Sequence, residues 1–334
     1  MKLLRYILFP IVPIYFLVTW TRNKLYDFGW KKSKSYKLPI ICVGNLSVGG
    51  TGKSPMIEYL IRLLNADYKL ATLSRGYKRE SSGFRLADET DSAKTLGDEP
   101  FQFYNKFGET VLVSVDANRQ HGISRLIDLK KKPEVILLDD AFQHRKVEAG
   151  FNILLTTYNN LFSDDILLPT GNLREPKSGA KRAHIIVVTK CPNAISKQEK
   201  EHIINKIKPT KEQHVFFSFI SYSNSVFSLN KTKKINQLGS FTLVTGIANA
   251  STLVDYLKAK NLTFNHLNFN DHHVFSKKEI DDLSKLDCIV TTEKDFMRLK
   301  SESKLQDNLF YLPIEFSIDG KETFNNLVLD YTKS

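Results

Sequence analysis

Residues 39–54, PIICVGNLSVGGTGKS, constrain the fold of this 334-residue chain more than any other stretch. The apolar residues 40–43 predict a short buried strand, which runs into a glycine-rich turn that ends in Gly52-Lys53-Ser54. In such a turn the backbone N–H groups crowd round an anion, the lysine adds a mobile positive charge and the serine hydroxyl can bind Mg²⁺. Apolar residues at helical spacing over 56–64 predict a helix whose N-terminal dipole points at the phosphate. The segment therefore predicts a phosphate-binding loop between a strand and a helix.

The spacing of this loop departs from the strict phosphate-loop pattern at one position. That pattern has a glycine five residues before Gly52, and this chain has Ser47 there. An ordinary glycine-rich loop is the alternative interpretation. It explains poorly why a buried strand runs directly into glycines and a lysine.

Apolar strands alternate with helical segments after the loop. Strands are predicted at 69–73, 111–115, 134–138, 151–155 and 184–190, and this rhythm is typical of a doubly wound α/β sheet. The composition changes near residue 212, a linking strand is predicted at 215–221, and the α/β rhythm resumes at Phe241, with a strand at 309–316 and a last helix. We therefore expect an α/β protein with a P-loop NTPase-like, mostly parallel sheet, a second, smaller α/β domain and an N-terminal membrane anchor. The expected parts are the anchor at 1–30, the kinase core at 31–212 and the smaller domain at 213–334.

The first twenty residues are apolar apart from Lys2, Arg5 and Thr19. The uninterrupted run, 7–18, is shorter than the roughly 18 residues of a membrane span, and Pro10 and Pro13 would break a regular helix. Basic residues on both flanks and tryptophans at 20 and 30 favour an anchor that enters one leaflet, with the body in the cytosol. A true span, a core-packed helix and a secretory signal are the alternatives, and the last lacks a cleavage site.

Charge and cysteine content limit the partners and the compartment. The net charge of +12 suits a polyanionic partner: a nucleic acid, an acidic membrane surface or a phosphorylated substrate. The three cysteines form no CxxC pair, which favours a reducing compartment and argues against a zinc or disulfide framework. The adjacent His272 and His273 have no spaced third ligand, so a single histidine acting as a base or orienter fits better than zinc.

Two acidic pairs stand beside predicted secondary structure. Asp139-Asp140 ends a buried strand, where an aspartate of phosphate-loop proteins helps to hold Mg²⁺. Asp98-Glu99 precedes Pro100 at the start of a predicted helix. Its local pattern favours helix capping, with metal binding or proton acceptance as alternatives.

Several motifs together resemble one enzyme family. In chain order they are Gly44-Asn45-Leu46, Gly49-Gly50-Thr51-Gly52-Lys53-Ser54-Pro55, Ser74-Arg75-Gly76-Tyr77, Gly97-Asp98-Glu99-Pro100, Asp139-Asp140-Ala141-Phe142-Gln143-His144, Leu173-Arg174-Glu175-Pro176, Asp271-His272 and Thr292-Glu293-Lys294-Asp295. This set resembles the tetraacyldisaccharide 4'-kinases, the membrane-associated kinases of lipid A synthesis in Gram-negative bacteria. The resemblance runs from the N-terminal segment to about Asp295.

The resemblance implies a reaction and a role for each matching residue. ATP would donate its γ-phosphoryl group, with Mg²⁺, to the 4'-hydroxyl of a tetraacylated glucosamine disaccharide 1-phosphate. Asp98 would take the hydroxyl proton, paired with His272, which reverses the local preference for capping. The ATP-binding residues would be Val48, Gly49, Gly50, Thr51, Gly52, Lys53, Ser54 and Pro55. The metal side would be Ser54, Glu99, Asp139 and Asp140, and the substrate and phosphate side Arg75, Tyr77, Arg119, His144 and Arg174.

The implied partners are an anionic glycolipid and the cytoplasmic face of the bacterial inner membrane, with neither nucleic acid nor an obligate protein partner. Ala141 stands where the family usually has glycine, and Ser54 replaces the commoner threonine. One rival is a membrane-surface ATPase of the deviant-loop class, which has a lysine just before the glycine pair; here that residue is Val48. A nucleotide-binding scaffold without chemistry is the second rival, and it would not need Asp98.

Overall fold

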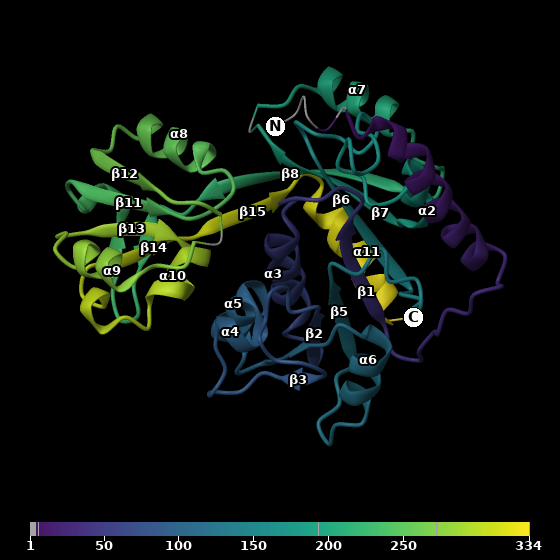
Figure 1. The fold of residues 1–334 in the computed structure, drawn as a ribbon, viewed down its shortest axis with the longest axis horizontal. Helices are drawn as coiled ribbons and strands as arrows, with labels where there is room; N and C mark the ends of the chain where they lie inside the picture. Colours follow the sequence, from purple (N-terminus) through teal and green to yellow (C-terminus); the bar gives the residue numbers. More distant parts are fainter. Residues whose placement is uncertain (1–4, 6, 193, 272, 334) are drawn as a thin grey trace.

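The computed structural model describes residues 5, 7–192, 194–271 and 273–333, which form two β-sheets with helices packed on them (Figure 1). The larger sheet has nine strands in the order β15-β8-β7-β6-β1-β5-β2-β4-β3. Only its edge strands, β15 and β3, run antiparallel to their neighbours. The prediction of an α/β protein with a mostly parallel sheet is therefore confirmed.

The strands of the larger sheet are β1 (Ile40–Asn45), β2 (Leu70–Ser74), β3 (Arg85–Leu86), β4 (Val111–Val115), β5 (Val135–Asp139), β6 (Phe151–Thr157), β7 (Ile185–Cys191), β8 (His214–Tyr222) and β15 (Ile314–Ile318). β1 lies between β5 and β6, so the chain builds the sheet outward in both directions from the strand that precedes the glycine-rich loop. Such a reversal leaves a crevice at the carboxyl ends of the strands, where ligands bind in open α/β sheets.

Helices cover both faces of this sheet. The helical segments of the larger unit are α3 (Lys53–Leu64), α4 (Ala93–Leu96), α5 (Asp98–Phe107), α6 (Arg119–Ile127), the 3₁₀ turn η2 (Lys177–Arg182), α7 (Lys197–Ile207) and α11 (Lys321–Lys333). One apolar cluster joins α3, α5 and α11 to one face of the sheet, and a second joins α6 and α7 to the other. Burial of both faces explains why the central strands are almost continuously apolar.

The smaller sheet has six strands in the order β10-β9-β14-β13-β11-β12. Its elements are β9 (Ser225–Phe227), β10 (Thr232–Lys234), η3 (Ile235–Gln237), β11 (Phe241–Thr245), α8 (Ser251–Ala259), β12 (Phe264–Asn268), α9 (Lys277–Leu283), β13 (Ile289–Thr292), α10 (Glu293–Leu299), η4 (Ser303–Leu305) and β14 (Leu309–Leu312). The four strands β12, β11, β13 and β14 are parallel.

The chain crosses between the sheets twice, through β8 into β9 and through β14 into β15 (Figure 1). The predicted single strand 309–316 is two strands, because Pro313 separates β14 from β15 and has no N–H to donate to a ladder. β15 then pairs with β8, with Ile314 opposite Tyr222. The second unit is consequently shorter than the predicted 213–334: β8, β15 and α11 belong to the larger sheet and its cover.

The apolar N-terminal segment is helical and lies on the outside of the larger unit (Figure 1). It consists of η1 (Phe9–Ile11) and α2 (Val12–Asp27), and no residue of either is buried. The expectation that Pro10 and Pro13 would break a regular helix is wrong, because each stands in the first turn of its helical element, where a missing N–H costs nothing. Among the residues described, none of the helices has both the length and the apolar character that a membrane crossing needs.

Candidate active site

The glycine-rich loop follows β1, whose six residues are all buried. A Cβ at Gly44 would lie 2.6 Å from the Phe142 Cβ, so the end of β1 has room only for glycine. Gly52 has a φ of +87° and is the N-cap of α3, which Lys53 and Ser54 begin. The lysine and serine therefore stand at the positive end of a helix, as the sequence predicts for a phosphate cradle.

Neighbouring segments hold the loop from two sides. The backbone N–H of Val48 donates to the carbonyl of Asn172 over 2.8 Å, and the Thr189 hydroxyl at the end of β7 donates to the carbonyl of Thr51 over 2.8 Å. A Cβ at Gly50 would lie 3.9 Å from Lys190 Nζ, so a second lysine stands close to the loop. Thr189 and Lys190 are not among the predicted site residues, although polar residues at the end of a buried strand are the signal that identifies Asp139.

Asp140 joins the loop lysine to a distant arginine. Its carboxylate lies 3.6 Å from Lys53 Nζ and accepts bonds of 3.0 and 3.2 Å from Arg174 Nη1. Burial alone would raise the pKa of Asp140, but the charges of Lys53 and Arg174 outweigh it and lower the pKa. Three predicted site residues thus meet in one place, although Arg174 follows Asp140 by 34 positions.

Asp139 is buried, and only part of its carboxylate is bonded. Oδ2 accepts a bond of 3.2 Å from the Ser74 hydroxyl, whereas Oδ1 has no hydrogen-bond partner among the described residues. Burial raises the pKa of Asp139 to about 6, and the nearby Asp140 and Glu99 charges add to the rise. An unbonded carboxylate oxygen near a phosphate loop fits a hard cation, which lowers the cost of this burial.

The donor set around the loop suits Mg²⁺ more than a metal held by protein alone. The described part of the chain contains no group of three or more His, Cys, Asp or Glu residues that could enclose an ion. Mg²⁺ in nucleotide enzymes takes one or two carboxylates and completes its octahedron with phosphate oxygens and water. Asp139, Asp140 and the Ser54 hydroxyl are residues of that kind.

Arg119 lies beneath the site, not in it. Only 1% of the residue is exposed, and its guanidinium donates to the backbone carbonyls of Asp116 and Asp139, the latter over 3.1 Å. Burial lowers its pKa to about 10, so it stays charged at neutral pH. Arg119 therefore has almost no exposed surface with which to contact a substrate, contrary to the expectation. It instead supports the end of β5.

The remaining predicted substrate residues are at least partly exposed. Arg75 and Tyr77 follow β2 and are exposed, Tyr77 by 64%. His144 is half-buried, and burial together with the charges of Arg119 and Arg75 lowers its pKa to about 4. His144 is therefore neutral at physiological pH.

Asp98 and Glu99 begin α5, where they face α10 of the second sheet. The N-cap of α5 is Gly97, with a φ of +92° and no side-chain capping bond, so neither carboxylate caps the helix. Asp98 Oδ2 lies 2.5 Å from Arg298 Nη2, and Glu99 Oε1 lies 2.9 Å from Lys294 Nζ. His272, the predicted partner of Asp98, lies outside the described residues.

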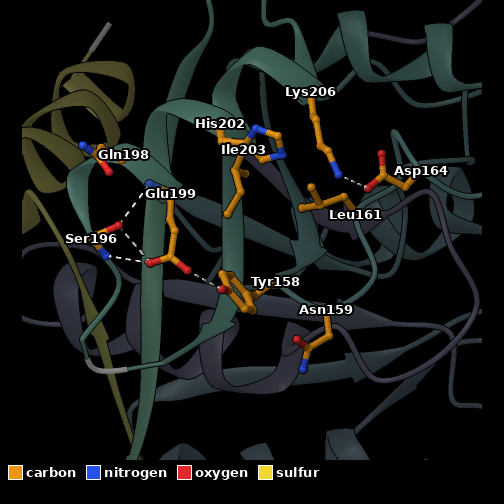
Figure 2. Close-up of a pocket in the computed structure, with 10 residues that line it drawn as sticks. All are labelled: Tyr158, Asn159, Leu161, Asp164, Ser196, Gln198, Glu199, His202, Ile203 and Lys206. Atoms are coloured by element: carbon orange, nitrogen blue, oxygen red, sulfur yellow. Dashed lines mark hydrogen bonds and ion pairs between the residues drawn. The ribbon is translucent and has the colours of Figure 1, made fainter.

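One cavity of the described structure lies apart from these residues. It has a volume of about 580 Å³ and lies between the loop that follows β6 and the helix α7 (Figure 2). Its polar groups bond to one another: Tyr158 to Glu199 over 3.1 Å, and Lys206 to Asp164 over 3.0 Å. None of the predicted site residues lines it, so this cavity is separate from the candidate site.

Comparison with known proteins shows which family this chain resembles. A family model described as tetraacyldisaccharide-1-P 4'-kinase matches residues 4–333. A tetraacyldisaccharide 4'-kinase of Flavobacterium psychrophilum is 52% identical over 100% of this chain and 98% of its own length, and one of Bacteroides fragilis is 42% identical over 98% and 93%. The crystal structure of LpxK from Aquifex aeolicus in complex with ATP superposes with a TM-score of 0.78 at 30% identity, covering 98% of this chain and 99% of that one.

Proposed function

This chain belongs to the tetraacyldisaccharide-1-phosphate 4'-kinase family, which makes it an ATP-dependent kinase of lipid A synthesis, and we propose that its residues act as follows. The γ-phosphoryl group of ATP is transferred to the 4'-hydroxyl of a tetraacylated disaccharide 1-phosphate, giving ADP and the 4'-phosphate. One observation carries the proposal most directly: Lys53 and Arg174 converge on Asp140 beside a phosphate loop, in a chain that matches the family along its length.

The nucleotide side consists of the loop from Val48 to Pro55 and the end of β5. The amides of this loop and Lys53 bind the β- and γ-phosphates, and Arg174 binds a phosphate oxygen with its planar guanidinium. Ser54, Asp139, Asp140 and Glu99 would hold Mg²⁺, which neutralises charge on the transferring phosphoryl group. The unbonded Asp139 Oδ1 supports this assignment.

The acceptor side is formed by Asp98, with His272 as its expected partner. The 4'-oxygen attacks the γ-phosphorus, the bond between that phosphorus and the bridging oxygen of ADP breaks, and the hydroxyl proton passes to the Asp98 carboxylate. Because the transition state of phosphoryl transfer is loose, Asp98 contributes mainly by orienting the hydroxyl. Arg75, Tyr77 and His144 would bind the sugar and its 1-phosphate.

Asp98→Ala tests this assignment. Loss of an acid–base group lowers turnover by about 10² or more, while ATP binding stays near the wild-type value. The measurement is formation of the 4'-phosphate from ATP, Mg²⁺ and the disaccharide 1-phosphate lipid, with nucleotide affinity measured separately. Turnover near wild type in this variant would refute the role of Asp98. ATP hydrolysis without any lipid product, in the unmodified chain, would favour a membrane-surface ATPase.

We further propose that α2 rests in one leaflet of the inner membrane, on its cytoplasmic face. Ile14, Leu17 and Val18 are 64%, 59% and 63% exposed, and the flanking cations suit anionic headgroups. The same helix is bonded to the site, because the Tyr15 hydroxyl donates to the carbonyl of Arg174 over 2.9 Å. A lipid held by α2 would therefore meet the segment that carries Arg174.

Replacing Ile14, Leu17 and Val18 by serine tests this placement. We expect the triple variant to co-sediment much less with phosphatidylethanolamine–phosphatidylglycerol vesicles than the unmodified chain. Its turnover of a short-chain, water-soluble acceptor should be unchanged. Undiminished co-sedimentation would show that another surface binds the membrane.

A further inference from the structure

Arg298 on α10 bridges two carboxylates that come from different sheets. Its Nη2 lies 2.5 Å from Asp98 Oδ2, and its Nη1 lies 2.9 Å from Asp295 Oδ1. We propose that Arg298 is a positioning residue that holds the Asp98 carboxylate in the orientation needed to receive the acceptor hydroxyl. This inference rests on the proposed role of Asp98 and adds a residue that the predicted site does not include.

The guanidinium is fixed from behind by a fully buried group. Asp295 has no exposed surface, and its Oδ2 accepts bonds from the backbone N–H of Gly246 over 2.9 Å and from the Thr292 hydroxyl over 2.7 Å. Arg298 Nη1 also donates to the carbonyl of Gly246 over 3.3 Å. One side of the guanidinium is thus anchored in the second unit, and the other is presented to Asp98.

The helices that carry the pair are packed together by an apolar cluster. Leu96 and Phe101 of the larger unit join Phe296 and Met297 of the second unit in one buried group. Beside it, Lys294 and Glu99 form the neighbouring cross-unit pair at 2.9 Å. The apolar packing and this ion pair therefore fix the position of α10 relative to the first turn of α5.

The geometry suits positioning better than general stabilisation. The side chains of Arg298 and Asp98 are 12% and 19% exposed, so the pair is largely shielded but still borders open space. A carboxylate in the first turn of a helix turns about its own side-chain bonds unless a partner fixes it. Arginine offers a planar fork that fixes both distance and direction, which the ammonium of lysine does not. A misplacement of about 1 Å at a reacting group costs about 10²-fold in rate.

The alternative is that Arg298 only joins the two units. Lys300 supplies a matched control, because its Nζ hydrogen-bonds Asn105 Oδ1 across the same two helices without touching Asp98. Lys300→Met removes the contacts that the C-terminal end of α10 makes with Asn105 and the Phe101 ring of α5, just as Arg298→Ala removes the contact with Asp98. If bridging were the whole function, the two variants would lose activity alike.

The experiment measures kcat and KM for Arg298→Ala, Arg298→Lys, Lys300→Met, Asp98→Asn and the Asp98→Asn, Arg298→Ala double variant, in the full chain with ATP, Mg²⁺ and the lipid acceptor. We expect Arg298→Ala to lower kcat by about 30- to 100-fold while KM for ATP changes less than about threefold. Arg298→Lys should recover part of the loss, and Lys300→Met should stay within about twofold of the unmodified chain. In the Asp98→Asn background, Arg298→Ala should cost less than about twofold more, because a residue acting through Asp98 has nothing left to position.

Each of the other possible results contradicts either the proposed function or the inference about Arg298. If Asp98→Asn turns over normally, the proposed function fails. If Asp98→Asn is slow but Arg298→Ala keeps half or more of the wild-type kcat, only this inference fails. Multiplying losses in the double variant would show that Arg298 acts by a route independent of Asp98, which also overturns it. Should Arg298→Ala show no cooperative thermal transition, the kcat of Arg298→Lys decides: an unchanged kcat refutes the inference.

Discussion

Two buried acidic clusters of this molecule look alike in composition but differ in how they are satisfied. The first is Asp139 and Asp140 at the end of β5. The second is Glu58 on α3 and Glu293 on α10, which share the ammonium of Lys106 and the amide of Gln102. In the second cluster both carboxylates form ion pairs with Lys106, although Glu293 Oε1 makes no hydrogen bond, whereas in the first Asp139 Oδ1 has neither a hydrogen-bond partner nor an ion pair among the described residues.

The comparison shows which observation identifies a ligand site. Burial raises the pKa of Glu293 as it raises that of Asp139, and Glu58 adds to the rise at Glu293. A perturbed pKa therefore occurs in both clusters and does not separate them. The separating features are the cation, Lys106, which pairs with both carboxylates of the second cluster and has no counterpart at Asp139 among the described residues, and the phosphate loop beside the first cluster. We assign ligand binding to the first cluster and the joining of α3, α5 and α10 to the second.

Lys53→Ala should give the largest effect and tests the first cluster. Lys53 lies at the start of α3, 3.6 Å from Asp140, and loss of such a preorganised cation should lower kcat/KM by about 10³. Isothermal titration should show weakened ATP binding, while thermal stability without nucleotide changes little. Normal turnover in this variant would show that the first cluster, like the second, has a structural role only.

Lys106→Met tests the second cluster. The substitution leaves two buried carboxylates without their shared cation, and breaking a buried pair costs about 3–5 kcal/mol of unfolding free energy. Urea denaturation at pH 8 measures it. The exposed pair of Lys206 and Asp164 supplies the control, since Lys206→Met should cost less than about 1 kcal/mol. Equal losses in the two variants would contradict the assignment.

Asp139→Asn should have the smallest effect of the three substitutions, and it should raise the free energy of unfolding instead of lowering it. The folded pKa of Asp139, about 6, lies above its ordinary 3.8, so its ionisation destabilises the fold at pH 8 by about 2–3 kcal/mol when no cation is bound. The amide removes that cost, and the gain should shrink as the pH falls from 6 towards 4, where the native carboxyl is itself protonated. Denaturation in EDTA across this pH range measures the gain, and turnover should fall although stability rises. A variant less stable than the parent at pH 8 would show that Asp139 is already compensated.

The residues proposed for the nucleotide side can be proposed from the sequence because the information is local. A strand, a glycine turn, Lys53 and the acidic end of β5 each have a signature within a few residues. The acceptor side is different: Arg298 meets Asp98 across 200 positions, and no local pattern links an arginine in one helix to an aspartate in another. Thr292-Glu293-Lys294-Asp295 is visible only as part of a family resemblance, whereas the structure assigns partners to its last three residues.

Two other differences between the predictions and the structure have physical causes that the sequence does not reveal: the burial of Arg119 and the return of the chain to the first sheet. Arg119 matches a family position as well as Arg174 does, but only the fold separates an arginine beneath β5 from one beside Asp140. Pro313 marks the break between β14 and β15, yet nothing nearby indicates that β15 rejoins the first sheet. The sequence predicts a domain boundary near residue 212 because the alternation of strands and helices changes there. The pairing of β15 with β8, which returns the chain to the first sheet, leaves no such signal.

The attachment of α11 to β1 has a consequence for biosynthesis. The Tyr331 hydroxyl accepts a hydrogen bond from the backbone N–H of Ile40 over 3.0 Å and donates one to its carbonyl over 3.1 Å, while Phe324 and Val328 close the apolar face above. These partners are translated 291 positions apart. At about 5–20 residues per second, the strand that carries the phosphate loop waits many seconds on the ribosome before its cover is made. The nucleotide site is thus among the last parts of the nascent chain to mature, and its apolar face needs shielding until then.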